Sequence, residues 1–137
     1  MRMRSTMVIY GESPVSHEVA ERIGGYLGAQ VGSTTCLDAA LLSCIENFVF
    51  CVSDEAEGGI PAEWQQVLLE LKPLCLSGKC FALYACGEER PGFHSYGCPA
   101  FVADLRSLGA HIVGIPAWCT QKERTIEEWV AEVSPNL

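Results

Sequence analysis

The sequence predicts an α/β fold in which five parallel strands form one sheet between two layers of helices. Short apolar runs recur along the chain, as expected for strands that are buried on both faces of a sheet. Segments with apolar residues at helical spacing separate these runs. This alternation is typical of right-handed βαβ units, and five strands in 137 residues fit a three-layer, doubly wound sandwich. We interpret residues 1–137 as one such domain.

The first half of the chain contains three predicted strands. Residues 7–10 form a buried strand that ends at Gly11, and a helix follows from Ser16, its N-cap, to Leu27. A weaker strand covers residues 30–35, and residues 37–45 form either a short helix or a loop. Residues 48–52, with the sequence Phe-Val-Phe-Cys-Val, form a strong strand candidate.

The second half continues the alternation with two strands and three helices. A helix begins near Pro61 and carries Trp64 on its apolar face. Residues 80–86 form a strand, and the next helix is marked by Phe101 and ends at Gly109. A last strand at 111–115 and an amphipathic helix at 125–133 close the chain.

Composition and charge favour some partners and exclude others. Seventeen acidic residues against nine Lys and Arg give a formal charge of −8, which disfavours nucleic acid and anionic membranes and favours a basic protein face. No apolar stretch approaches the ~20 residues that cross a bilayer, and the apolar run after the basic start is short for a signal peptide. We therefore expect a cytoplasmic protein whose eight cysteines are reduced. No two of them form CxxC, so we expect them in the core, with no metal site.

Several segments, in order along the chain, resemble short-chain flavodoxins. Residues 76–87, Leu-Ser-Gly-Lys-Cys-Phe-Ala-Leu-Tyr-Ala-Cys-Gly, are similar to that family's L-x-G-K-x-x-A-x-F-G-x-G segment. Residues 96–114 are similar to its cysteine, helix and L-x-x-L-G-A-x-I-V, and both residues 7–11 and the closing helix with Trp129 fit as well. The resemblance implies the strand order 2-1-3-4-5 and non-covalent FMN binding. It also implies transfer of single electrons between redox partners, without enzymatic activity.

The resemblance places the FMN phosphate at the loop after the first strand, in a degenerate form of the family's S/T-x-T-G-N-T sequence. In this chain the loop consists of Glu12, Ser13, Pro14, Val15, Ser16 and His17. The two serines offer hydroxyl donors, whereas the proline lacks an N–H and a valine stands where the family has glycine. A phosphate here requires Glu12 to face solvent, with protonated His17 compensating its charge. The alternative is a capped helix start that binds no anion.

The resemblance assigns the flavin ring to two further loops, at the edge of the sheet where parallel strands end. The first ring loop contributes Ser53, Asp54, Glu55, Ala56 and Gly58. It lacks the aromatic residue that many family members stack on the flavin, but its glycine offers a peptide that accepts a hydrogen bond from flavin N5. The second ring loop contributes Gly87, Phe93, His94, Tyr96 and Cys98, and we expect Tyr96 or Phe93 to stack on the ring.

The sequence leaves three functions open. The first is an FMN-dependent electron carrier whose acidic rim steers basic redox partner proteins. The second is a protein of the same fold that has lost FMN and uses the same loops to bind a protein or another ligand. The third is a thiol-dependent enzyme centred on Cys98, with Arg90 and His94 upstream, although no motif fixes a base beside that thiol.

Overall fold

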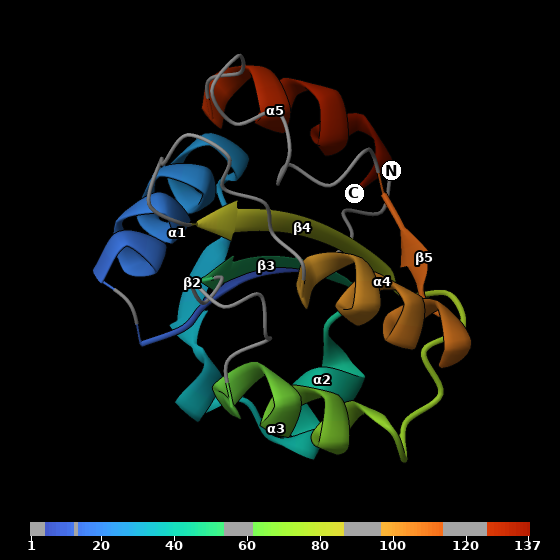
Figure 1. Cartoon of the computed structure of the whole chain (residues 1–137). Helices are drawn as coiled ribbons and strands as arrows, with labels where there is room; N and C mark the ends of the chain where they lie inside the picture. The colour runs from blue at the N-terminus through green and yellow to red at the C-terminus, as the bar shows by residue number, and fades with distance from the viewer. Residues whose placement is uncertain (1–4, 13, 54–61, 87–96, 114–125) are drawn as a thin grey trace.

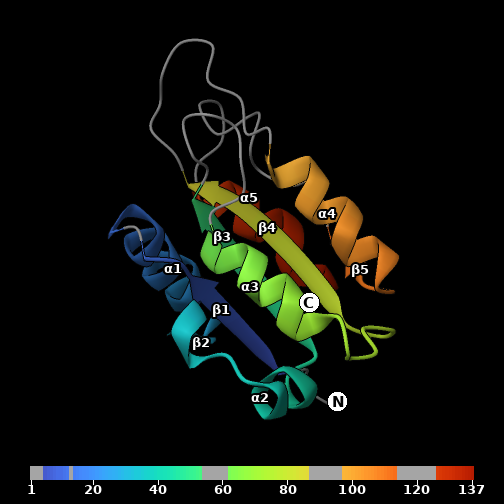
Figure 2. The same cartoon turned by 60° about the horizontal axis from the view of Figure 1, so that its bottom comes forward.

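Five parallel strands form one sheet, in the order β2-β1-β3-β4-β5 that the sequence predicts (Figure 1). The computed structural model describes residues 5–12, 14–53, 62–86, 97–113 and 126–137. Its strands are β1 (Thr6–Tyr10), β2 (Gln30–Ser33), β3 (Asn47–Ser53), β4 (Cys80–Cys86) and β5 (His111–Ile112). All four neighbouring pairs are parallel, so the carboxyl ends of the strands meet at one edge (Figure 2).

Helices cover both faces of this sheet (Figure 1). One layer contains α1 (Pro14–Leu27) and α5 (Ile126–Val133), and the other contains α2 (Ala39–Cys44), α3 (Ala62–Leu71) and α4 (Gly97–Ser107). Two short 3₁₀ segments, Thr34–Cys36 and Ser134–Asn136, follow β2 and α5. The predicted three-layer sandwich is therefore confirmed over the described residues.

Each face of the sheet has its own apolar core, because alternate residues of a strand point to opposite faces. In β3, Phe48 and Phe50 belong to the core under α2, α3 and α4, whereas Val49 belongs to the core under α1 and α5. The ring centroids of Phe50 and of Trp64 in α3 are 5.0 Å apart. On the other face, Trp129 of α5 packs edge-on against Tyr84 of β4. The unbroken apolar run of β3 thus serves both cores.

Several element boundaries differ from the predictions. The last strand, predicted at 111–115, is β5 at His111–Ile112; Val113 lies outside it, and residues 114 and 115 are not among the described residues. The first helix begins at Pro14 rather than after Ser16, because proline is already shaped for the first helical position and Ser16 turns into the interior. The second strand ends at Ser33, where the 3₁₀ segment begins. The segment left open as helix or loop is α2, since the Asp38 side chain caps it by accepting the Leu41 N–H at 2.7 Å. Gly109 ends α4 with a φ of 96°, as predicted.

The cysteines are divided between core and surface. Cys51 and Cys80 are buried in strands, as predicted, but Cys36, Cys44 and Cys75 are exposed, contrary to the expectation of core packing. All three lie outside the strands: Cys36 ends a 3₁₀ segment, Cys44 ends α2 and Cys75 lies between α3 and β4. Within the described ranges, no group of His, Cys, Asp and Glu is arranged to hold a metal ion. None of the helices there has the length and apolar character that a bilayer-spanning segment needs.

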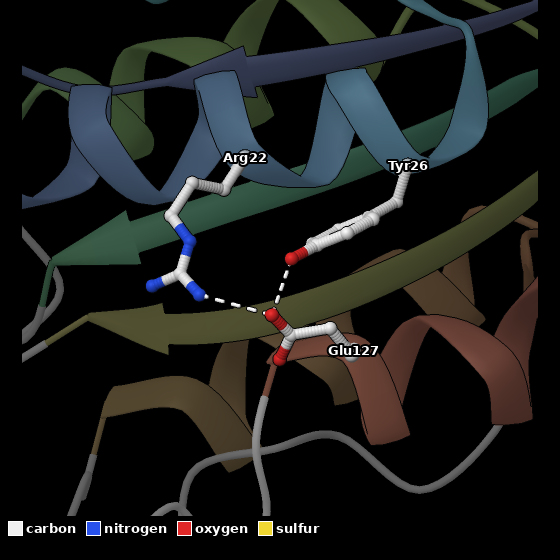
Figure 3. Close-up of polar contacts among 3 residues, drawn as sticks. All are labelled: Arg22, Tyr26 and Glu127. Atoms are coloured by element: carbon white, nitrogen blue, oxygen red, sulfur yellow. Dashed lines mark hydrogen bonds and ion pairs between the residues drawn. The ribbon is translucent and has the colours of Figure 1, made fainter.

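An exposed polar cluster joins α1 to α5 on the outer surface (Figure 3). Arg22 Nη2 lies 3.2 Å from Glu127 Oε1, and the Tyr26 hydroxyl donates a hydrogen bond to the same oxygen. The two α1 residues stand one helical turn apart, so both reach one carboxylate of the neighbouring helix. This cluster links the two helices of that layer at their exposed surface.

Candidate functional site

The candidate site lies at the carboxyl edge of the sheet, around the end of β1. The register pairs Tyr10, the last residue of β1, with Ser33 of β2 on one side and Cys51 of β3 on the other. Beyond Tyr10 the chain passes through Gly11 and Glu12, which we call the Gly11–Glu12 turn, and then enters α1. Because strand order reverses on either side of β1, this is the switch point where ligands bind in such sheets.

Ser16 fastens the Gly11–Glu12 turn from inside. Its Oγ accepts the Gly11 N–H at 3.0 Å and donates to the Cys51 carbonyl at 2.8 Å. The side chain is fully buried, so it bridges β1, β3 and the first turn of α1 without contact with water. Its single hydroxyl hydrogen is used by Cys51. The sequence-based expectation that this hydroxyl donates to a phosphate therefore does not match the structure.

Glu63, in the first turn of α3, closes the same turn from the other side. Its Oε2 accepts the Glu12 N–H at 2.9 Å. Its carboxylate lies against the bare Cα of Gly11, where a Cβ would overlap Oε1. The same Cβ position lies 3.1 Å from Nε1 of Trp64, whose indole N–H is buried and has no partner among the described residues. A side chain at position 11 would therefore displace the Glu63 carboxylate from its present place.

His17 extends along the outer side of α1. Its ring stacks on that of Tyr10, with centroids 4.2 Å apart and planes 17° from parallel. Its Nε2 lies 3.2 Å from Oε1 of Glu21, one helical turn further on. The imidazole is therefore paired with Glu21 rather than placed to compensate Glu12, as the sequence had suggested. Glu12 itself is exposed, which agrees with the condition set for it above.

A cavity of about 360 Å³ opens between the ends of β1 and β2. Its lining includes the Glu12 carboxylate and the His17 ring. It also includes three hydroxyl-bearing residues, Ser33, Thr34 and Thr35. The hydroxyls of Ser33 and Thr35 lie 2.5 Å apart. This cavity lies on the β2 side of β1, whereas the ring loops were expected on the β3 side.

An exposed thiol, that of Cys36, follows the hydroxyl-bearing residues of this cavity in the chain. Cys36 is exposed, and its Sγ lies 3.5 Å from the Ser33 hydroxyl. Hydrogen bonds from the side chain and backbone of Ser33, with a smaller one from Thr35, lower the pKa of the Cys36 thiol. These hydrogen bonds favour the thiolate over the thiol.

The structure describes only part of the predicted flavin contacts. Of the phosphate-loop residues, it brings Glu12, Pro14, Val15, Ser16 and His17 together at the start of α1. Ser53 ends β3 and Cys98 lies in the first turn of α4, but their side chains are outside the described part. The remaining predicted contacts lie outside the described residues altogether: Ser13, Asp54, Glu55, Ala56, Gly58, Gly87, Phe93, His94 and Tyr96.

Sequence reasoning missed two contributors to this edge. Glu63 was not singled out from the sequence, because an acidic residue in a first turn is favourable to any helix and points to no site. The hydroxyl run 33–35 was assigned to a strand, although its position just after a strand that ends at the site was a usable signal.

The described groups fit an FMN phosphate only in part. The amide of Val15 belongs to the first turn of α1, where no carbonyl of the same helix accepts it, and the positive helix end favours an anion. The Gly11–Glu12 turn does not fit, because both of its amides are already bonded and its other neighbour is the Glu63 carboxylate. A phosphate would therefore rest on α1 alone in this arrangement.

Several solved flavodoxins align with this chain over nearly its whole length. Flavodoxin 2 from Bacillus cereus aligns with a TM-score of 0.80 and 16% identity, covering 97% of this chain and 99% of its own. The Fusobacterium nucleatum flavodoxin bound to flavin mononucleotide gives 0.78 and 14%, covering 98% and 99%. A short-chain flavodoxin associated with a non-canonical PDU bacterial microcompartment gives 0.73 and 18%, again covering 98% and 99%. No family model and no curated protein sequence matches the chain. The likeness establishes the flavodoxin-like fold.

Proposed function

We propose that this protein is a flavodoxin-like electron carrier that binds FMN non-covalently at the carboxyl edge of its sheet. The observation that supports this most is the switch point itself, where α1 begins directly beyond β1 and between β2 and β3. The structural neighbours include a flavodoxin bound to FMN and align over nearly the whole of both chains. A bound flavin would supply reversible electron uptake, and the protein would supply position and electrostatics.

The residues of this chain have separate tasks under the proposal. The first turn of α1 would face the phosphate with its amides and its positive helix end. The two ring loops predicted from the sequence, with Tyr96 or Phe93 stacking, would hold the isoalloxazine and exclude water. The formal charge of −8 would draw basic redox partners to the protein and repel acidic ones.

The closed Gly11–Glu12 turn favours a second candidate function. Both amides of the turn are satisfied by Ser16 and Glu63 without any ligand. A loop that is complete by itself suits a protein that has lost FMN and binds a protein or a different small molecule at the same edge. This candidate and the first differ in one property, the affinity for FMN.

Titration of the purified protein with FMN separates the two candidates. The carrier proposal predicts a yellow preparation, or a colourless one that quenches the fluorescence of added FMN with one site per chain. A colourless protein that leaves the fluorescence of excess FMN unchanged would rule out the carrier and leave the binding module.

Ring variants test the assigned aromatic residues in the same titration. Tyr96→Ala or Phe93→Ala should weaken FMN binding by about 0.5–1.5 kcal/mol for the residue that stacks. Tyr26→Ala is the matched control, since Tyr26 is exposed on α1 and bonds to Glu127 rather than to the edge. If neither ring variant differs from this control, the aromatic assignment is wrong.

A further inference from the structure

Glu63 reaches into the candidate site from another element. The N-terminus of α1 is the part of the edge that attracts anions, and the Gly11–Glu12 turn leads directly into it. Glu63 belongs to α3, on the opposite side of the sheet from α1. Its carboxylate nevertheless bonds to the Glu12 amide at 2.9 Å, across 51 positions of sequence.

The position of this carboxylate is fixed by its surroundings. Because Gly11 has no Cβ, the Glu63 carboxylate can lie against the Gly11 backbone. Trp64, the next residue of α3, is fully buried and anchors this end of the helix in the core. The half-buried side chain is held at this place by its hydrogen bond to the Glu12 amide. Within the described ranges, no Lys or Arg forms an ion pair with Glu63.

A negative charge at this point acts against a phosphate in two ways. It uses the Glu12 amide, a donor that an incoming anion would need, and it repels a dianion at short range. The second carboxylate of the turn, on Glu12, is exposed to water and more strongly screened. A ligand without a phosphate meets neither obstacle.

We propose that Glu63 is a specificity-determining residue that acts as a built-in competitor for phosphate at the Gly11–Glu12 turn. Its carboxylate takes the place of an anion and lowers the preference of the site for FMN over the uncharged flavin, riboflavin. For its flavin readout the inference rests on the proposed function. For a simple anion it stands independently.

Glu63→Gln is the informative variant, because the side-chain oxygen remains able to accept the Glu12 N–H while the charge is removed. The dissociation constants of FMN and riboflavin are measured by fluorescence quenching for the wild type and the variant. We expect the ratio of the two constants to shift towards FMN by about tenfold, equivalent to about 1.4 kcal/mol. Glu70→Gln is the matched control, since it removes the same charge from the same helix, away from the turn.

An equal ratio in the Glu63→Gln and Glu70→Gln proteins would overturn the inference. If neither flavin binds to any of the three proteins, the proposed function fails, and a titration with inorganic phosphate decides the inference. The amide NMR signals of Gly11 and Glu12 should then respond at about tenfold lower phosphate concentration in Glu63→Gln than in the wild type. The same response in both proteins would overturn it.

Discussion

Single hydroxyl and carboxylate groups determine the state of the candidate site. Ser16 is the clearest case, because one buried oxygen completes the bonding of an amide in one segment and a carbonyl in another. The net contribution of such bonds is modest, but leaving buried partners unsatisfied has a larger cost. The residue that the sequence suggested as a phosphate donor is thus a structural link between β1, β3 and α1.

Replacing Ser16 tests this role. Ser16→Ala leaves the Gly11 N–H and the Cys51 carbonyl without their partner, so we expect the free energy of unfolding to fall by about 1–3 kcal/mol. Urea denaturation gives the value. Ser43→Ala is the control, because Ser43 is exposed and its hydroxyl bonds only to Ala40 in its own helix. A loss for Ser16→Ala no larger than that for Ser43→Ala would contradict the structural role.

The sequence predicts the site only as far as local chemistry reaches. The charge of Glu12 led to the condition that it must face solvent if a phosphate binds, and Glu12 is exposed in the structure. The roles of Ser16 and Glu63 depend on partners 35 and 51 positions away, which no local pattern encodes. Their hydrogen bonds exist only after the sheet has brought β1, β3 and the start of α3 together.

Whole elements were more predictable than their ends. The apolar runs of β3 and β4 identify strands because both faces are buried, and α5 buries the four apolar positions expected from its spacing. Ends depend on single groups: Pro14 starts α1 two residues before the predicted cap, and Asp38 decides that α2 is a helix. The exact end of a helix is therefore harder to predict than the helix itself.

A pair of adjacent glycines in α1 tests how closely this helix packs on the sheet. A Cβ on Gly24 would overlap Cγ2 of Val31 in β2, whereas one on Gly25 would meet no atom within 4 Å. We expect Gly24→Ala to destabilise the protein by about 1–3 kcal/mol through overpacking. Gly25→Ala should stabilise it by about 0.5–1 kcal/mol, because alanine loses less conformational entropy in a helix.

Denaturation curves of the two alanine variants provide the comparison, and each serves as the control for the other. The substitutions are identical and lie one residue apart in the same helix, so helix propensity alone predicts the same change for both. Equal effects would show that α1 does not pack against β2 as described.

At the scale of the whole molecule, the scaffold matches the flavodoxin-like fold. The strand order, the two cores and the position of α1 at the switch point are those of the flavodoxin-like fold. In the Gly11–Glu12 turn, however, both amides are hydrogen-bonded to side chains of this chain, Ser16 and Glu63. With a formal charge of −8, the protein as a whole also disfavours any added negative charge.

A reductive titration of the FMN-loaded protein under anaerobic conditions tests the electron-carrier account most directly. The account predicts that the protein separates the uptake of the two electrons and lowers the potential of the second below that of free FMN. The reason is that the second electron adds charge next to an acidic ring loop with Asp54, Glu55 and Glu57. Potentials that are the same with and without the protein would contradict the account.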